Sequence, residues 1–391
     1  MHEGASLPLR IPVLVPDLPD AQELMPWLSR IDAARQYTNF GPLVQEFEGS
    51  LSSVWGNATE PVNVISANSG TAALELCVAA LALPPCASVL MPSFTFPATA
   101  TSVCRTGLIP LFTDVAPYTW QLTPEMARNA MRTHEFALVM PVATFGCPAD
   151  MAGWDAFVVE TGIPVLIDAA AAFGNQTVGL YAHVAFSFHA TKPFGIGEGG
   201  ALATRDWALA RRVRNLSNFG FDASLVCAPG FNAKLSEYAA AVALAQWARQ
   251  PTQQANRRAL WSAYADALSI TAGLTMQRGF GPDQLPAALV VNLALPAQDV
   301  AAALAQSGIQ TRRWYCPPLH YHDVFAACAR CGPEGDTRLP VTEHLAEHSL
   351  GLPWFAGMSQ TQCAAVVATL QAVLDTGLLK NGKTAPAMLG A

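Results

Sequence analysis

Charged side chains are scarce in this chain. Only 13% of the 391 residues are Asp, Glu, Lys or Arg, whereas soluble domains usually carry about 25%. Much of the surface is therefore expected to be covered, and a large interface between subunits is the simplest cover. The net charge is −7 and no basic run occurs, which argues against a nucleic-acid partner.

The chain also lacks an unbroken transmembrane segment. Residues 76–104 contain no charged side chain and are long enough to cross a bilayer. However, Pro84, Pro85, Pro92 and Pro97 divide this stretch into a helix end, a turn, a strand, a turn and a helix start. The first residues lack a basic region followed by an apolar one, so no secretory signal is expected. We predict no membrane span and a cytoplasmic location.

The cysteines do not form a paired framework. There are nine of them, scattered along the chain, as is usual for free thiols in reducing compartments. Cys328 and Cys331 form a single CxxC motif without a second pair, so we interpret them as an incidental pair in a loop. No metal site is predicted.

Between residues 61 and 204, short apolar runs alternate with helical patterns, which is typical of a mostly parallel sheet flanked by helices. The predicted α/β sheet has seven strands, at residues 62–66, 89–92, 109–113, 137–142, 164–167, 183–188 and 201–204.

The chain is long for one hydrophobic core, so we predict a large domain over residues 1–250 and a smaller C-terminal α/β domain over residues 251–391. The elements expected after the sheet are connector helices at 236–249 and 253–269, a strand near 287–295, a helix near 297–307, a proline-rich loop at 316–319, a closing helix near 360–374 and a loose C-terminal tail.

Lys192 stands between the apolar run 183–188 and a glycine-rich turn at 195–200. When a lysine at the end of a buried strand is desolvated, the pKa of its amine falls and the amine becomes nucleophilic. The turn glycines let the backbone pass close to a ligand. Taken alone, the segment is equally consistent with an ordinary loop lysine.

Two further polar features follow predicted strands. Asp168 ends an apolar strand, where a buried carboxylate needs a partner such as a protonated ring nitrogen. It could also cap the alanine turn that follows it. Ser69, Gly70 and Thr71 open a helix after the first strand, an arrangement that presents N–H groups and hydroxyls to a phosphate. Plain helix capping is the alternative for this segment.

An aromatic side chain, Phe96, follows the second strand at the same predicted sheet edge. It could stack on a flat ring or pack in the core. Together, an imine-forming lysine, an acid for a pyridine nitrogen, a phosphate cup and a stacking ring are the parts needed to hold pyridoxal phosphate. The four features are much more specific jointly than singly.

At this point the chain resembles the DegT/DnrJ/EryC1/StrS family of sugar aminotransferases, which have the fold-type I aminotransferase architecture. The similar segments are Thr38-Asn39-Phe40-Gly41-Pro42, Ser69-Gly70-Thr71-Ala72-Ala73-Leu74, Pro92-Ser93-Phe94-Thr95-Phe96, Phe145-Gly146-Cys147-Pro148-Ala149-Asp150-Met151, Ser187-Phe188-His189-Ala190-Thr191-Lys192, Glu198-Gly199-Gly200, Asn218-Phe219-Gly220, Arg313-Trp314 and Pro318-Leu319-His320.

The resemblance assigns a role to each cofactor residue. It implies that Lys192 is the Schiff-base lysine, that Asp168 pairs with the pyridine nitrogen and that Phe96 stacks on the ring. It implies a phosphate site made by the Ser69-Gly70-Thr71 turn and Ser187. Asn232 matches a family asparagine that reaches the phosphate of the neighbouring subunit, which implies a homodimer with shared sites.

Three positions depart from the family pattern. Ala171 stands where the family has a glutamine that contacts the cofactor's phenolic oxygen, and Phe173 replaces a histidine. Without the glutamine, the cofactor's geometry is expected to differ from that of relatives. Lys234 replaces an arginine and loses its planar, bidentate hydrogen-bonding group.

The implied reaction is a two-stage transamination. An amine donor, which is usually glutamate in this family, gives its nitrogen to the cofactor, and a keto acceptor then receives the nitrogen. The resemblance implies that Lys192 acts as general base and acid in both stages. For the family the acceptor is a nucleotide-linked keto-deoxysugar, used in amino-sugar biosynthesis. The candidate substrate contacts are Thr38, His189, Arg313, Trp314 and His320, and a structural role is open for the last three.

Three alternatives stay open. A non-nucleotide keto-cyclitol could be the acceptor, because nothing in the sequence identifies a base or sugar pocket. Sugar dehydratases related to this family carry histidine in place of the Schiff-base lysine, and Lys192 is present. A regulatory protein that binds DNA or an effector is disfavoured by the acidic balance and by the intact pair of Lys192 and Asp168.

Overall fold

A twisted, mostly parallel sheet forms the centre of the molecule. The structure is a computed structural model that describes residues 11–57, 59–333 and 336–380. The sheet runs in the order β1-β7-β6-β5-β4-β2-β3, with isolated bridges from Val139 to Val165 and from Val142 to Asp168 joining β4 to β5. Its strands are β1 (Asn63–Ala67), β2 (Ser88–Pro92), β3 (Ile109–Thr113), β4 (Leu138–Val139), β5 (Leu166–Asp168), β6 (His183–Ser187) and β7 (Gly200–Thr204).

All seven predicted strands are present, and the fold-type I prediction agrees with this arrangement. Only β7 runs against its neighbours β1 and β6. Strand β4 is shorter than predicted, because Pro141 has no N–H group to donate to a neighbouring strand.

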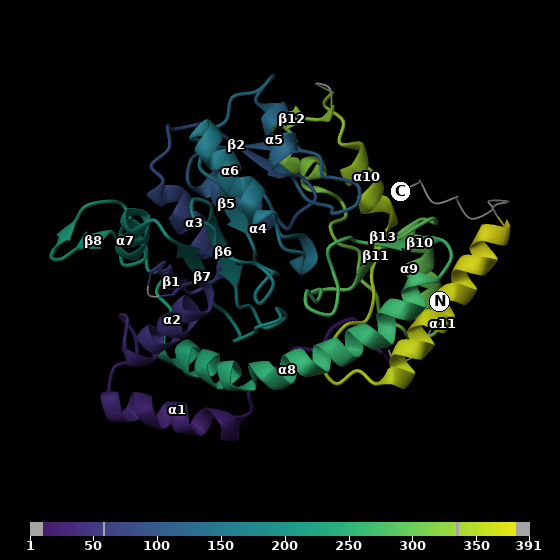
Figure 1. Cartoon of the computed structure of the whole chain (residues 1–391), viewed down its shortest axis with the longest axis horizontal. Helices are drawn as coiled ribbons and strands as arrows, with labels where there is room; N and C mark the ends of the chain where they lie inside the picture. The colour runs from purple at the N-terminus through teal and green to yellow at the C-terminus, as the bar shows by residue number, and fades with distance from the viewer. Residues whose placement is uncertain (1–10, 58, 334–335, 381–391) are drawn as a thin grey trace, which may run out of the picture.

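Helices cover both faces of this sheet, as Figure 1 shows. Residues 76–104 form the end of α3, strand β2 and most of α4, so the predicted breaks at the prolines are confirmed. In the described part of the chain, no helix combines the length and apolar character needed to cross a bilayer. The helices are α1 (Ala21–Ala34), α2 (Pro42–Trp55), α3 (Gly70–Ala80), α4 (Pro97–Arg105), α5 (Pro124–Ala130), α6 (Met151–Thr161) and α7 (Trp207–Leu216).

One long helix, α8 (Glu237–Ser269), replaces the two predicted connector helices. The prediction of a break at Pro251 was wrong. Proline removes one intrahelical hydrogen bond, but the helix buries residues on both sides of it. Ala240 and Leu244 pack in the core of the large sheet, whereas Leu260 and Tyr264 pack in the C-terminal core. In Figure 1, α8 runs along the base of the molecule from α2 to α11.

The C-terminal part forms a second, smaller sheet with helices. The predicted strand near 287–295, helix near 297–307 and closing helix near 360–374 are all present, and the predicted tail at 381–391 lies outside the described residues. The elements are β10 (Leu274–Met276), β11 (Val290–Leu293), α9 (Ala297–Gln306), α10 (Pro340–His348), β13 (Ser349–Gly351) and α11 (Gln360–Lys380), and the sheet order is β10-β11-β13.

The two parts of the chain are joined by more than α8. Strand β12 (Arg330–Cys331) pairs in parallel with β3 at the edge of the large sheet. Cys331 therefore lies buried in a strand rather than in the predicted loop. The predicted boundary between residues 250 and 251 falls inside α8, and the division into domains stays a prediction.

Buried carboxylates hold the starts of two helices. The Glu237 carboxylate is fully buried and accepts hydrogen bonds from the N–H groups of Leu43 and Val44, each at 2.9 Å. A Cβ atom at Gly41 would lie 2.6 Å from Glu237 Cδ, so glycine is required there. Asp114 holds the start of α10 in the same way, accepting from the N–H of Thr342 at 2.7 Å.

We expect Glu237→Gln to lower the free energy of unfolding by about 1–3 kcal/mol, because its amide group would turn an NH₂ toward a buried N–H donor. Chemical denaturation followed by circular dichroism measures this. Glu160→Gln is the matched control, since the exposed Glu160 pairs with Arg128 at the surface; it should cost less than about 1 kcal/mol. Equal effects of the two variants would contradict the capping role.

Candidate active site

Asp168 lies buried at the carboxyl end of β5. Its Oδ2 accepts a hydrogen bond from Thr99 Oγ1 at 2.7 Å, and its Oδ1 accepts from the Ala170 N–H at 3.1 Å. Burial raises the pKa of this carboxyl, while the two hydrogen bonds and the charge of Lys192 oppose the rise. The bond to Ala170 is the cap considered from the sequence, so capping and chemistry coexist here.

Lys192 lies at the same edge of the sheet. Strand β5 pairs in parallel with β6, with Asp168 opposite Ala185, and the turn after β6 is closed by a 2.8 Å hydrogen bond from the Lys192 N–H to the His189 carbonyl. Burial lowers the pKa of the Lys192 amine; the charge of Asp168 opposes this shift and that of Arg312 adds to it. A desolvated amine whose charge is coupled to that of a carboxylate is suited to covalent chemistry.

The predicted phosphate cup is assembled from segments far apart in the sequence. A Cβ atom at Gly70 would lie 2.6 Å from Ser187 Cβ, so the start of α3 packs directly on the end of β6. Ser69 Oγ accepts from the Ala72 N–H at 3.1 Å and caps the helix. The N–H groups of Gly70 and Thr71 belong to the first turn and have no acceptor within the helix.

Phe96 does not pack in the core. Its side chain is 57% exposed, and the residue stands at the N-cap position of α4, next to the end of β2. Thr95 of the same segment shares a 2.8 Å hydrogen bond with Thr99, the residue that donates to Asp168. The ring is therefore accessible at the edge of the sheet that carries Asp168.

Asn232 is exposed, and its backbone lies beside the phosphate cup of its own chain. Its carbonyl accepts from Asn68 Nδ2 at 3.4 Å, and the residue bridges to Asn218. Lys234 Nζ donates to Asn218 Oδ1 at 2.8 Å and lies 5.0 Å from the centre of the Phe219 ring. That Asn232 reaches a neighbouring subunit stays a prediction.

The departures from the family pattern have local explanations. Phe173 joins an aromatic cluster, with its ring centre 4.7 Å from that of Phe194 and 5.8 Å from that of Phe188. A polar ring there would lose this packing. The Ala171 carbonyl would lie 2.9 Å from a Cβ at Gly146, so the 144–146 turn packs closely on this backbone.

The predicted substrate residues are not all together. Thr38 is exposed beside the start of α2. His189 is next to the Lys192 turn, with Nδ1 2.8 Å from Thr191 Oγ1 and Nε2 3.7 Å from Glu198 Oε1. Arg313 instead faces α9 and α10, because it donates to the Ala346 carbonyl at 3.0 Å and to Gln298 Oε1 at 3.3 Å.

His320 is a buried structural contact in this chain. Its Nδ1 is 2.7 Å from Ser93 Oγ, at the end of β2, and its Nε2 is 3.6 Å from Glu343 Oε1. Burial lowers the pKa of the imidazole and Glu343 opposes this shift. The side chain links the proline-rich loop to the sheet and to α10, so direct contact with a substrate stays a prediction that this geometry does not support.

Three residues near the site were not found from the sequence. Thr99 is in the first turn of α4 and bonds Thr95, which precedes the helix, and no local pattern singled it out. Tyr315 stacks on Phe145 with ring centres 5.3 Å apart. Burial and the charge of Asp168 raise the pKa of its hydroxyl, and Arg312 opposes the rise. Arg312 is the third of these residues. No local sequence pattern distinguishes it from Arg313, the residue that the sequence analysis selected.

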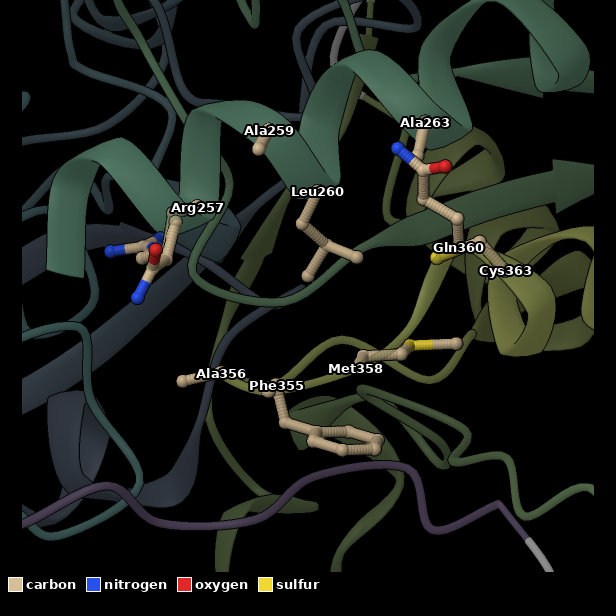
Figure 2. A pocket seen from close by; sticks show the side chains of 11 residues that line it. Arg257, Ala259, Leu260, Ala263, Phe355, Ala356, Met358, Gln360 and Cys363 are labelled. Carbon is tan, nitrogen blue, oxygen red and sulfur yellow. The ribbon is translucent and has the colours of Figure 1, made fainter. Parts of the chain in front are cut away.

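A separate hollow lies away from these residues. A pocket of about 290 Å³ separates α8 from the segment 355–363. Figure 2 shows Leu260 of α8 on one side and Phe355 and Met358 on the other. A smaller hollow adjoins it through Arg257 and reaches the Lys192 turn. The larger pocket is mostly apolar and carries none of the predicted site residues.

The residues present fit pyridoxal phosphate. A buried acid, a nucleophilic amine, an exposed ring and a helix start with free N–H groups meet at one edge of the sheet. The close approach of Gly70 and Ser187 leaves no room for a side chain at the cup, as backbone recognition of a phosphate requires.

Comparison with known proteins identifies the family of this chain. A model of the DegT/DnrJ/EryC1/StrS aminotransferase family matches residues 20–371. Protein Rv3402c of Mycobacterium tuberculosis is 32% identical, over 94% of this chain and 91% of its own. The UDP-N-acetyl-3-dehydro-alpha-D-glucosamine 3-aminotransferase of Acidithiobacillus ferrooxidans is 33% identical, over 78% of this chain and 83% of its own.

A solved structure shows the same fold. DesI, crystallised in the presence of its TDP-sugar product, superposes with a TM-score of 0.84 and is 29% identical, covering 97% of this chain and 96% of DesI. Proteins named for sugar substrates or products are thus similar over 78% and 97% of this chain. The chain belongs to the DegT/DnrJ/EryC1/StrS aminotransferase family and is a pyridoxal-phosphate-dependent aminotransferase.

Proposed function

We propose that this enzyme moves an amino group from glutamate to a nucleotide-linked keto-deoxyhexose, for amino-sugar biosynthesis. The observation that carries the proposal is the facing pair of Asp168 and Lys192 beside the Gly70 cup. The sugar class rests on relatives, since one is named for a UDP-linked sugar and another was crystallised with a TDP-sugar. The free cysteines support a reducing, cytoplasmic compartment.

Each residue has a task that follows from its chemistry. Pyridoxal phosphate, when bound, supplies a ring that accepts electrons from the substrate carbon. Asp168 holds a proton on the ring nitrogen, and Thr99 orients the carboxylate through its 2.7 Å hydrogen bond. Lys192 Nζ takes a proton from the substrate and returns it, which a lowered pKa favours. The exposed Phe96 side chain would stack on the cofactor's ring and exclude water from it.

We expect purified protein to bind pyridoxal phosphate with a visible absorbance band that borohydride abolishes and that glutamate converts to a shorter-wavelength band. Lys192→Ala should lose the covalent link and turnover, because it removes both the nucleophile and the proton carrier, while its circular dichroism stays unchanged. Absorbance spectroscopy of the two proteins measures this.

The acceptor is identified by the reverse half-reaction. The glutamate-treated enzyme is mixed with UDP-linked or TDP-linked keto-sugars and with a keto-cyclitol, and the return of the visible band marks the acceptor. A protein that stays colourless after the cofactor is added would contradict the aminotransferase function and favour a regulatory role. Return of the band with the cyclitol alone would leave an aminotransferase but overturn the nucleotide-sugar acceptor.

The lowered pKa of Lys192 predicts the pH dependence of cofactor capture by the apoprotein. Capture requires the neutral amine, so its rate rises with pH and levels off above the pKa, below the value of about 10.4 for an ordinary lysine. The charge of Asp168 raises this pKa. Asp168→Asn should therefore move the profile to lower pH. Stopped-flow absorbance measures the rates, and a profile centred at the ordinary value would contradict the desolvation argument.

We propose further that the enzyme is a homodimer with sites shared between subunits. The hairpin of β8 (Phe221–Asp222) and β9 (Leu225–Val226) projects from the side of the sheet (Figure 1). Leu225 and Val226 are 69% and 60% exposed, and Phe219 and Phe231 beside them are also exposed. Adjacent exposed apolar side chains of this kind mark an interaction surface, and the hairpin adjoins Asn232.

We expect Leu225→Glu to shift the protein from dimer to monomer, because a buried charge opposes association. Analytical ultracentrifugation at several concentrations measures this. Val159→Glu is the matched control, since Val159 is 66% exposed on α6 and lies outside the hairpin. A monomeric wild type, or a dimer unaffected by Leu225→Glu, would contradict the proposed interface.

A further inference from the structure

Two hollows on the C-terminal side of the molecule meet at one arginine. The larger, of about 290 Å³, lies between α8 and the segment 355–363. The smaller, of about 60 Å³, separates α8 from residues 14–17 and from the Lys192 turn. Arg257 and Leu260 of α8 line both hollows. A charged side chain therefore stands where the two spaces adjoin.

Arg257 is a partly buried cation without an acidic partner. Its Nη2 donates to the Pro286 carbonyl at 2.6 Å, and that carbonyl also accepts from Trp354 Nε1 at 2.9 Å. In the described part of the chain, no carboxylate lies within 4.0 Å of its guanidinium. Burial lowers the pKa of the guanidinium to about 10. A guanidinium carries several N–H donors in a planar fork, so one shared carbonyl leaves most of them without an acceptor.

The carboxylate that borders the smaller hollow is already engaged. Asp17 accepts from Arg249 Nη2 at 2.6 Å and from Gln253 Nε2 at 3.0 Å. Gln253 lies one turn before Arg257 on α8, and its buried Oε1 has no hydrogen-bond partner among the described residues. Asp17 is thus not available to neutralise Arg257. The polar end of the space has hydrogen-bonding capacity that the described chain leaves unused.

The larger hollow offers an apolar wall next to this charge. Leu260 and Ala263 line it from α8, and Phe355 and Met358 line it from the opposite segment, as Figure 2 shows. An apolar hollow with a few placed polar groups is typical of sites for small organic molecules. The residues assigned to the cofactor's ring nitrogen, ring face and phosphate are not among those that line either hollow.

We propose that this space binds a small organic acid with an apolar body, at a site separate from that of the cofactor. The carboxylate of the acid accepts from the remaining N–H groups of Arg257, whose planar fork matches two carboxylate oxygens. The apolar body lies against Leu260, Phe355 and Met358, where it is removed from water. A sugar lacks the charge for this site, and inorganic phosphate lacks the apolar body.

Calorimetry with phenylbutyrate, which carries a carboxylate on a phenyl body, tests the proposal on the cofactor-loaded protein. Phenylbutanol has the same body without the charge, and acetate has the charge without the body. We expect phenylbutyrate to bind at least about tenfold more tightly than either, because each of the others lacks one of the two contacts. Equal affinities for phenylbutyrate and phenylbutanol would overturn the proposal.

Two variants change the two halves of the site separately. Arg257→Gln should weaken phenylbutyrate binding at least about tenfold, as loss of charge-assisted hydrogen bonds does. Arg258→Gln is the matched control, because Arg258 is the next residue of α8, is exposed and donates to the Pro282 carbonyl instead; binding should be unchanged. Ala263→Leu places extra atoms in the larger hollow and keeps every charge and the bond to Pro286, and it should also weaken binding.

Glutarate distinguishes this site from a site for the amino donor. It has two carboxylates and little apolar surface, so at equal concentration it should not displace phenylbutyrate from the wild type. Displacement by glutarate would place the carboxylate in a donor site and overturn the proposal. Phenylbutyrate binding that survives both Arg257→Gln and Ala263→Leu would overturn it as well, and so would a wild type that does not bind phenylbutyrate.

Discussion

The coupling of two opposite buried charges, Asp168 and Lys192, underlies the rest of the site. Each is pulled toward its neutral form by loss of water, and each favours the charged form of the other. Parallel pairing of β5 with β6 brings the two groups to one edge of the sheet. Thr99 then fixes the carboxylate from α4. Burial without this mutual support would leave an inert acid and an inert amine.

Around this pair, buried carboxylates orient the segments that surround it. Glu237 holds the start of α2 after the Thr38 segment, and Asp114 holds the start of α10 close to the proline-rich loop. A carboxylate at a helix start satisfies N–H groups that have no partner in the helix and complements the helix dipole. His320 adds a third link through Ser93. The hydrogen bonds of Glu237, Asp114 and His320 therefore fix the loop segments that surround the site.

The scarcity of charge and the departures from the family pattern share one physical theme, the replacement of polar contacts by apolar packing. Phe173 completes an aromatic cluster at the position where the family resemblance led us to expect histidine. The β8–β9 hairpin exposes aliphatic side chains. Arg312 likewise lies against an indole, with its guanidinium 5.1 Å from the centre of the Trp314 ring.

The sequence by itself determined the seven strands and the positions of Asp168, Lys192 and the Ser69-Gly70-Thr71 turn next to strand ends, because each depends on local alternation, on a strand end or on a residue without a side chain. Only the tertiary structure decided the continuity of α8 through Pro251, the pairing of β12, the burial of His320 and the contacts of Arg313 with α9 and α10. These features depend on contacts between segments far apart in the chain.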